Sequence, residues 1–167
     1  MTANSFVAQA PVLPIRGARV CLVLSTNGKR WGIPKGRIER RHTAGETALQ
    51  EAWEEAGLVG VLRRNPVGSY RYQKCGKDFH VTVFFMMVSE ITDTFPEDHR
   101  RLRRWVRTDK MLRHISDPSL RRLLRRVLAA SARFFPLPNS KFRTGPCRLT
   151  CGSRKGCLVG DGHFRDH

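Results

Sequence analysis

The segment GRIERRHTAGETALQEAWEEAGL, residues Gly36–Leu58, joins a glycine-containing loop to a stretch rich in helix-forming residues. It contains no proline, and Gly57 near its end readily takes the left-handed conformation that closes many helices. These features predict a helix over Thr43–Ala56. The segment is therefore expected to fold as a loop followed by one amphipathic helix.

Three carboxylates crowd one face of this predicted helix. At 100° per residue, Glu51, Glu54 and Glu55 fall within an arc of roughly 100°. The opposite side carries apolar residues that we expect in the core, namely Leu49, Trp53 and Ala56. Like charges three or four residues apart destabilise an isolated helix by about 0.2–0.5 kcal/mol per pair. The spacing alone leaves two interpretations open, a solvated acidic face or a site for a cation.

The whole segment resembles the Nudix box of the Nudix hydrolases, G-x5-E-x7-R-E-U-x-E-E-x-G-U, where U is an apolar residue. The matching positions are Gly36, Glu51, Ala52, Glu54, Glu55, Gly57 and Leu58. Two positions depart from the pattern, since His42 replaces its first Glu and Gln50 replaces its Arg. In the family these two residues commonly form a supporting salt bridge, so a neutral hydrogen bond between His42 and Gln50 is the expected substitute here.

The resemblance implies a metal site on the acidic face. By similarity to the family, Glu51 and Glu55 would bind Mg²⁺ or Mn²⁺ with help from the backbone carbonyl of Gly36. Glu54 would be a further ligand or the general base. Hard divalent cations prefer oxygen ligands and neutralise charge during phosphoanhydride hydrolysis. The cation would then relieve the repulsion among the three glutamates.

The identity of the general base is left open, because different Nudix enzymes use residues at different positions in the chain as the base. Glu97 and Asp98, in a polar loop further along the chain, are alternatives to Glu54, although a solvated loop explains both residues equally simply. Four arginines close to that loop are interpreted as solvated surface charge: Arg100, Arg101, Arg104 and Arg107.

Basic residues near the box are candidate contacts to the substrate. Lys35 and Arg37 flank Gly36, within reach of a phosphate near the metal, and an Arg can donate two parallel hydrogen bonds to it. His80 and Arg103 occupy positions similar to phosphate-binding arginines of the inositol pyrophosphate branch of the family. A structural histidine on a strand is the simpler interpretation of His80.

Outside the box, apolar and β-branched runs predict strands on both sides of the helix, and a second, arginine-rich helix follows Asp117. We predict the α/β class, a Nudix α/β/α sandwich with a mixed sheet. Because of its two prolines, residues 1–15 are predicted to be a loose leader. The resemblance implies a Nudix hydrolase domain over residues 16–133, and residues 134–167 are predicted to be a disordered basic tail.

Charge and hydropathy limit the classes of partner. From Phe134 onward, six Lys and Arg stand against two Asp and Glu, so the first 133 residues carry +13 of the net +17. This excess predicts an anionic partner such as a polyphosphate, a nucleic acid or an acidic membrane surface. No apolar run approaches the roughly 20 residues of a membrane span, and a secretory signal pattern is missing. We expect a cytoplasmic protein of undetermined oligomeric state.

Two functions fit these observations. The order of the segments WGIPKG, GSYRY, FHVTVFFMMV and FPEDHRRLRRW is similar to the diphosphoinositol polyphosphate and dinucleoside polyphosphate phosphohydrolase branch. This resemblance implies an enzyme that cleaves a phosphoanhydride bond in a polyphosphorylated small molecule. The alternative is a nucleic-acid-associated Nudix protein, either of decapping type or non-catalytic. Its contact surface would be the basic helix over Leu120–Arg133 together with the tail.

Overall fold

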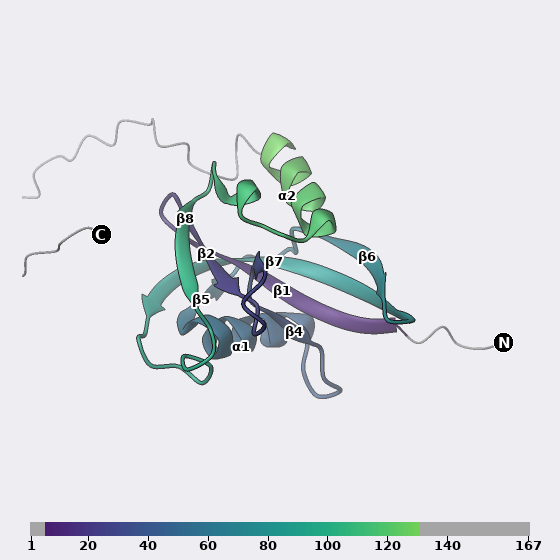
Figure 1. Ribbon diagram of the computed structural model, residues 1–167, viewed down its shortest axis with the longest axis horizontal. Helices are drawn as coiled ribbons and strands as arrows, with labels where there is room; N and C mark the ends of the chain where they lie inside the picture. Colours follow the sequence, from purple (N-terminus) through teal and green to yellow (C-terminus); the bar gives the residue numbers. More distant parts are fainter. Residues whose placement is uncertain (1–5, 131–167) are drawn as a thin grey trace, which may run out of the picture.

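A computed structural model describes residues 6–130 of the chain (Figure 1). Four strands precede the first helix, four more follow it, and the second helix comes last, with the sheet between the two helices. In chain order the elements are β1 (Phe6–Arg16), β2 (Arg19–Leu24), β3 (Trp31–Gly32), β4 (Lys35–Arg37), α1 (Ala44–Ala56), β5 (Leu58–Leu62), β6 (Gly68–Lys74), β7 (Lys77–Ile91), β8 (Arg103–Arg107), the short 3₁₀ helix η1 (Met111–Arg113) and α2 (Pro118–Ala130). The predicted tail and the end of the second predicted helix lie outside the described residues.

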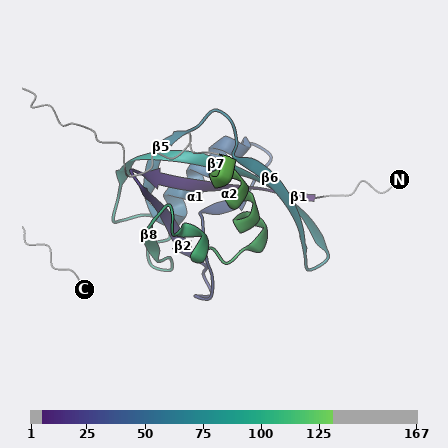
Figure 2. The same ribbon diagram turned by 90° about the horizontal axis from the view of Figure 1, so that it is seen from above.

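The strands form one mixed sheet. Its central path runs β3-β2-β1-β7-β5, with β4 beside β1, β6 beside β7, and β8 beside β2. β1 and β7 are parallel, and the other pairs are antiparallel. Helix α1 covers one face and α2 the other, as Figures 1 and 2 show from two directions. The predicted α/β sandwich with a mixed sheet is confirmed.

The prediction of a loose leader is wrong from residue 6 onward, because Phe6–Arg16 is the strand at the centre of the sheet. It pairs in parallel with β7 from Phe6 to Ile15 and meets β4 and β2 along its other edge. Gln9–Ile15 is buried throughout. The prolines in this stretch lower strand propensity, but pairing on both sides outweighs that cost.

Helix α1 meets the sheet through small residues rather than large ones. Ala48, Ala52 and Ala56 are fully buried against a core cluster on this face, whereas Leu49 and Trp53 stay more than a third exposed. The expected core role of Leu49 and Trp53 is therefore wrong. Alanines four residues apart make a flat stripe that lets the helix approach the sheet closely. Close approach brings the carboxylates of the helix within reach of the neighbouring strands.

Helix α2 packs on the other face of the sheet. Leu120 and Leu124 are buried there with residues of β1, β2, β7 and β8. Arg122, Arg125 and Arg126 are exposed away from this apolar stripe, as the sequence pattern predicts, whereas Arg121 is half-buried. Within residues 6–130 no helix is long and apolar enough to cross a membrane.

Candidate metal and substrate site

Both ends of α1 are fixed by local hydrogen bonds. Thr43 Oγ1 accepts from the Glu46 backbone N–H (3.2 Å), and Glu46 Oε2 accepts from the Thr43 backbone N–H (2.7 Å). This reciprocal pair is a capping box. Gly57 closes the other end at φ 62°, where its N–H bonds to carbonyls of the last turn. The caps confirm the predicted helix and fix the direction of its acidic face.

The carboxylate of Glu51 lies directly against Gly36 in β4. A Cβ placed on Gly36 would come within 1.6 Å of Glu51 Oε1, a distance that no real contact reaches. A glycine at this position lets the Glu51 carboxylate lie against the backbone of β4, and a larger residue would push that carboxylate aside. The backbone N–H of Lys35 donates to Glu55 Oε2 (3.3 Å), so two carboxylates of α1 converge on β4.

Burial and mutual repulsion perturb these carboxylates. Burial raises the pKa of Glu55 to about 7, against the opposing effect of the Arg101 guanidinium. Burial also raises the pKa of Glu51, and the negative charges of Glu54 and Glu97 add to the shift. Desolvated like charges at one place are typical of functional sites, because a fold rarely keeps them for stability alone.

The loop after β7 lies over the acidic face and places Arg101 there. From the sequence, Arg101 is expected to be a solvated surface charge. Arg101 is only 14% exposed and forms an ion pair with Glu55. Its Nε donates to Glu97 Oε2 (2.7 Å), and the Glu97 N–H donates to the carbonyl of Glu54 (3.0 Å). The interpretation of Arg101 as surface charge is wrong. The only sequence signal was its spacing of four residues from Glu97.

The two departures from the box pattern do not pair with each other. Gln50 Nε2 donates to Glu54 Oε1 (2.8 Å) instead of reaching His42. The backbone N–H of His42 donates to the Glu39 carbonyl (3.1 Å) and so closes a turn in the loop. The expected His42–Gln50 hydrogen bond is therefore wrong. Gln50 orients a carboxylate of the acidic face, one turn along the same helix.

The four predicted substrate-binding residues are placed differently. Lys35 and Arg37 are exposed at the two ends of β4, and the charge of Lys35 is close enough to oppose the pKa shifts of Glu51 and Glu55. The guanidinium of Arg103 is turned away from this site. Its Nη1 donates to the carbonyls of Ala56 (2.7 Å) and Thr92 (2.6 Å), and its Nη2 donates to Asp93 Oδ1 (2.9 Å).

Arg103 therefore ties the carboxyl end of α1 to the loop after β7, and its contact with a substrate stays a prediction. Helix carbonyls in the last turn have no partner within the helix, and a buried guanidinium satisfies them well. The neighbouring arginines are also engaged locally. Arg104 lies over the Trp31 ring at 4.5 Å, and Arg107 pairs with Asp109.

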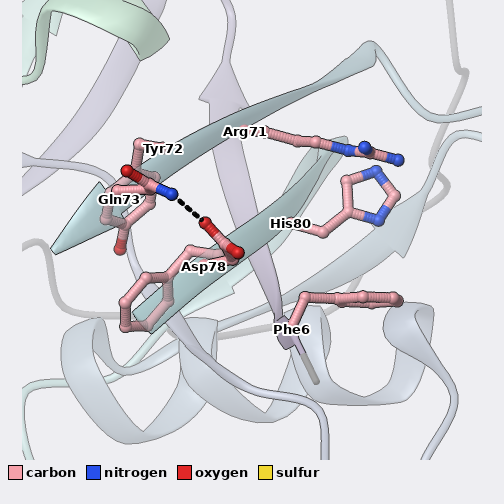
Figure 3. A pocket seen from close by; sticks show the side chains of 7 residues that line it. Phe6, Arg71, Tyr72, Gln73, Asp78 and His80 are labelled. Atoms are coloured by element: carbon pink, nitrogen blue, oxygen red, sulfur yellow. Dashed lines mark hydrogen bonds between the residues drawn. The ribbon is translucent and has the colours of Figure 1, made fainter. Parts of the chain in front are cut away.

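His80 lies at the opposite end of the sheet from the loop of Arg101, in a hollow of about 580 Å³ (Figure 3). Arg71 faces His80 across the β6–β7 pair, and the Phe6 ring meets the imidazole edge-on at 5.6 Å. Among residues 6–130, Arg71 has no ion-pair or hydrogen-bond partner for its guanidinium. The hollow is lined by Phe6, Arg71, Tyr72, Gln73, Asp78, Phe79 and His80.

The donor set on the acidic face suits a hard divalent cation. Glu51, Glu54 and Glu55 offer carboxylate oxygens, and Gly36 offers a backbone carbonyl, which are the ligand types that Mg²⁺ and Mn²⁺ prefer. Within the described part of the chain, no three His, Cys, Asp or Glu side chains already converge as metal ligands. Two of the carboxylates have other partners, since Arg101 pairs with Glu55 and Gln50 with Glu54. The chemistry of the residues fits the cation, which would replace Arg101 and Gln50 as the partners of these carboxylates.

Known structures share this fold. The Ap4A hydrolase of C. elegans superposes with a TM-score of 0.61 at 18% identity, covering 75% of this chain and 98% of that one. A NUDIX hydrolase from Nitrosomonas europaea superposes with a TM-score of 0.65 at 16% identity, covering 80% and 94%. At such identities the likeness concerns the fold alone.

Curated relatives are similar in sequence over the same region. Nudix hydrolase 12, mitochondrial, of Arabidopsis thaliana is 33% identical over 101 residues, which are 56% of this chain and 50% of that protein. Nudix hydrolase 4 of the same plant is 36% identical over 94 residues, 55% of this chain and 45% of that protein. The chain spans about half the length of these relatives. Residues 6–127 match the family described as NUDIX domain, and the chain belongs to this family.

Proposed function

We propose that this protein is a metal-dependent Nudix hydrolase that cleaves a phosphoanhydride bond in a polyphosphorylated small molecule. The observation that carries the proposal is the contact of the Glu51 carboxylate with Gly36, beside the buried carboxylate of Glu55. Glu55 is buried and Glu51 is half-buried, and carboxylates desolvated in this way contribute little to stability because each one costs desolvation energy. A divalent cation would offset that cost.

Glu51 and Glu55 would hold Mg²⁺ or Mn²⁺ together with the carbonyl oxygen of Gly36. Bound there, the cation would neutralise charge on the phosphate oxygens. Glu54 would act as the general base or as a further ligand, and the hydrogen bond from Gln50 would orient its carboxylate.

Glu97 is a weaker candidate for the general base. Although partial burial opposes the shift, hydrogen bonds from Arg101 and Arg100 hold the pKa of Glu97 below its ordinary value. A carboxylate whose pKa is lowered accepts a proton less readily, and general bases work best with a pKa near the operating pH. The arrangement therefore favours Glu54.

The substrate that fits best is an inositol pyrophosphate or a dinucleoside polyphosphate. Lys35 and Arg37 flank the cluster, and the chain carries a formal net charge of +17, which suits a compact polyanion. His80 and Arg71, with the Phe6 ring, offer cationic and aromatic contacts in the hollow of Figure 3. These contacts suit a remote phosphate or a stacked base.

The test is release of phosphate or nucleotide with Mg²⁺ and with Mn²⁺ from inositol pyrophosphates, dinucleoside polyphosphates, nucleoside triphosphates and capped RNA. Glu54→Gln is expected to lower turnover by about 10²-fold or more if Glu54 is the base. Glu39→Gln, an exposed carboxylate in the neighbouring loop, is the matched control and should retain turnover. Equal activity of the Glu54→Gln and wild-type proteins would remove Glu54 from the mechanism, and no metal-dependent release from any compound would contradict the proposal.

A nucleic-acid-associated role is the second candidate, because three arginines of α2 and Pro118 line a hollow of about 290 Å³. The arginines are Arg121, Arg122 and Arg125. Binding of RNA or DNA through this surface would weaken log-linearly with salt concentration, whereas turnover of a small molecule would depend chiefly on the divalent cation. A cytoplasmic location likewise stays a prediction.

A further inference from the structure

Arg101 already occupies the position of a cation in the acidic cluster. It forms an ion pair with Glu55 Oε1 through Nη2, and a hydrogen bond to Glu97 Oε2 through Nε. Its Nη1 donates to the carbonyl of Leu24 (3.3 Å). The neighbouring Arg100 is a useful contrast, because within residues 6–130 its only ion pair is with Glu97 and its side chain is 54% exposed. Arg101 alone of these two arginines bridges the loop after β7 to the acidic face of α1.

The guanidinium competes with a divalent cation for the same carboxylate. Glu55 Oε2 already accepts the Lys35 N–H, and Glu55 Oε1 is taken by Arg101. A cation that binds Glu55 must share or displace one of these donors, and the backbone N–H is fixed by strand β4. Two positive charges at one buried carboxylate repel each other strongly. Arg101 is therefore the partner that has to move.

A displaced guanidinium would remain in the site, because its other contacts do not involve Glu55. Glu97 and the Leu24 carbonyl still hold it, and the Glu97 N–H is bonded to the carbonyl of Glu54. Arg103 further ties this loop to the end of α1. The freed N–H groups would then face the cluster where a phosphate meets the cation. Arginine suits that contact, since its planar fork bonds two phosphate oxygens at once.

We propose that Arg101 is a substrate-binding residue that is paired with Glu55 in the metal-free protein and passes its guanidinium to a substrate phosphate once a divalent cation binds Glu55. This inference rests on the proposed function, because it needs the cation at Glu55. It assigns a role to a loop residue outside the Nudix box.

The first test is a calorimetric titration of the full-length protein with Mn²⁺ alone. Arg101→Gln removes the competing charge and is expected to tighten Mn²⁺ binding by about tenfold, the size of a typical coupling between two ligands. Arg101→Lys keeps a charge but loses the fork, so its affinity should lie between the two. Arg100→Gln is the matched control and should bind Mn²⁺ as the wild type does. Melting curves of all four proteins establish that they are folded.

The second test measures binding of imidodiphosphate, a non-hydrolysable pyrophosphate analogue, at saturating Mg²⁺. Arg101→Gln is expected to weaken this binding by about tenfold, because one bidentate contact is lost. If Arg101→Gln fails to fold, Arg101→Lys should still show tighter Mn²⁺ binding and weaker imidodiphosphate binding.

Two results would overturn the inference while leaving the proposed function intact. In both, the wild type binds Mn²⁺ and turns over substrate. In the first, the Arg101 variants bind Mn²⁺ as tightly as the wild type or more weakly. In the second, they bind imidodiphosphate as tightly as the wild type. A wild-type protein that neither binds Mn²⁺ nor shows turnover would instead refute the proposed function, and the inference with it.

Discussion

The two helices carry opposite charges and use them in opposite ways. On α1, Glu51 packs on β4, Glu54 accepts from Gln50, and Glu55 pairs with Arg101 from a distant loop. On α2, three arginines are exposed and form no ion pair within residues 6–130: Arg122, Arg125 and Arg126. Both faces have the same helical periodicity, yet only the acidic one is enclosed by other elements.

This contrast shows that charge spacing on a helix does not by itself define a site. An enclosed face holds its side chains in fixed directions and raises the energy of unpaired charge, so a ligand is needed to complete it. A solvated face needs no ligand, because water and salt already screen its charges. The contrast makes four predictions, in order of decreasing effect.

Gly36→Ala is expected to have the largest effect. Its Cβ would overlap Glu51 Oε1, so the carboxylate must turn away from β4. Displacement of a reacting group by about 1 Å can cost roughly 10²-fold in rate, and we expect a loss of turnover of at least that size. Gly32→Ala is the control, since nothing lies within 4 Å of its Cβ. Near-normal turnover of Gly36→Ala would show that Glu51 does not need its place beside β4.

The buried acid should make the metal-free protein less stable as pH rises. Burial raises the pKa of Glu55 from 4.5 to about 7, so the folded state binds a proton that the unfolded state releases. The stability is fully present below pH 4.5 and is lost as pH rises through 7. The loss amounts to roughly 2–3 kcal/mol. Denaturant titrations between pH 5 and pH 8 measure it.

Glu55→Gln should flatten this dependence, because an amide does not titrate. Mn²⁺ should reduce the loss at pH 8 in the wild type by binding the folded state. A wild-type protein whose stability is constant or increases over this interval would show that Glu55 is already ionised below pH 5.

Removing the N-terminal cap of each helix distinguishes an effect on stability from an effect on turnover. Thr43→Ala removes the cap of α1, and Asp117→Ala removes the hydrogen bonds that Asp117 Oδ1 accepts from the N–H groups of Ser119 and Leu120. Each change should cost about 1 kcal/mol in free energy of unfolding. Only Thr43→Ala should also lower turnover, since α1 carries the acidic cluster. Equal losses of turnover in the two variants would argue against a special role for α1.

The smallest effect is expected for the solvated face. The double variant Arg122→Gln, Arg125→Gln should change the free energy of unfolding by no more than about 0.5 kcal/mol and leave turnover unchanged. Thermal melting and the substrate assay measure both quantities. A large loss of turnover would mean that α2 contributes to the substrate site.

Local chemistry explains which features the sequence predicts well. The capping pair of Thr43 and Glu46 and the terminal Gly57 define α1 from neighbouring residues alone. The family pattern also predicts the position of Gly36, because it fixes the spacing of fifteen residues between Gly36 and the carboxylate of Glu51. Such features depend on residues that are close in the chain.

Features that depend on distant residues were missed. The burial of β1 results from β7, and its prolines gave a misleading local signal. The partner of Arg101 lies forty-six positions away, so no spacing rule connects it with Glu55. Trp53 stays on the surface because the sheet accepts only a flat stripe of alanines at close range. Contacts between elements decide these outcomes.

The most direct test of the account is the affinity of the wild-type and Glu51→Gln proteins for Mn²⁺, measured side by side in one calorimetric series. If the acidic face of α1 is a metal site, the wild type binds Mn²⁺ and Glu51→Gln binds it at least about tenfold more weakly, with an unchanged or higher melting temperature. Equal affinities of the two proteins, or no Mn²⁺ binding by the folded wild type, would contradict the account.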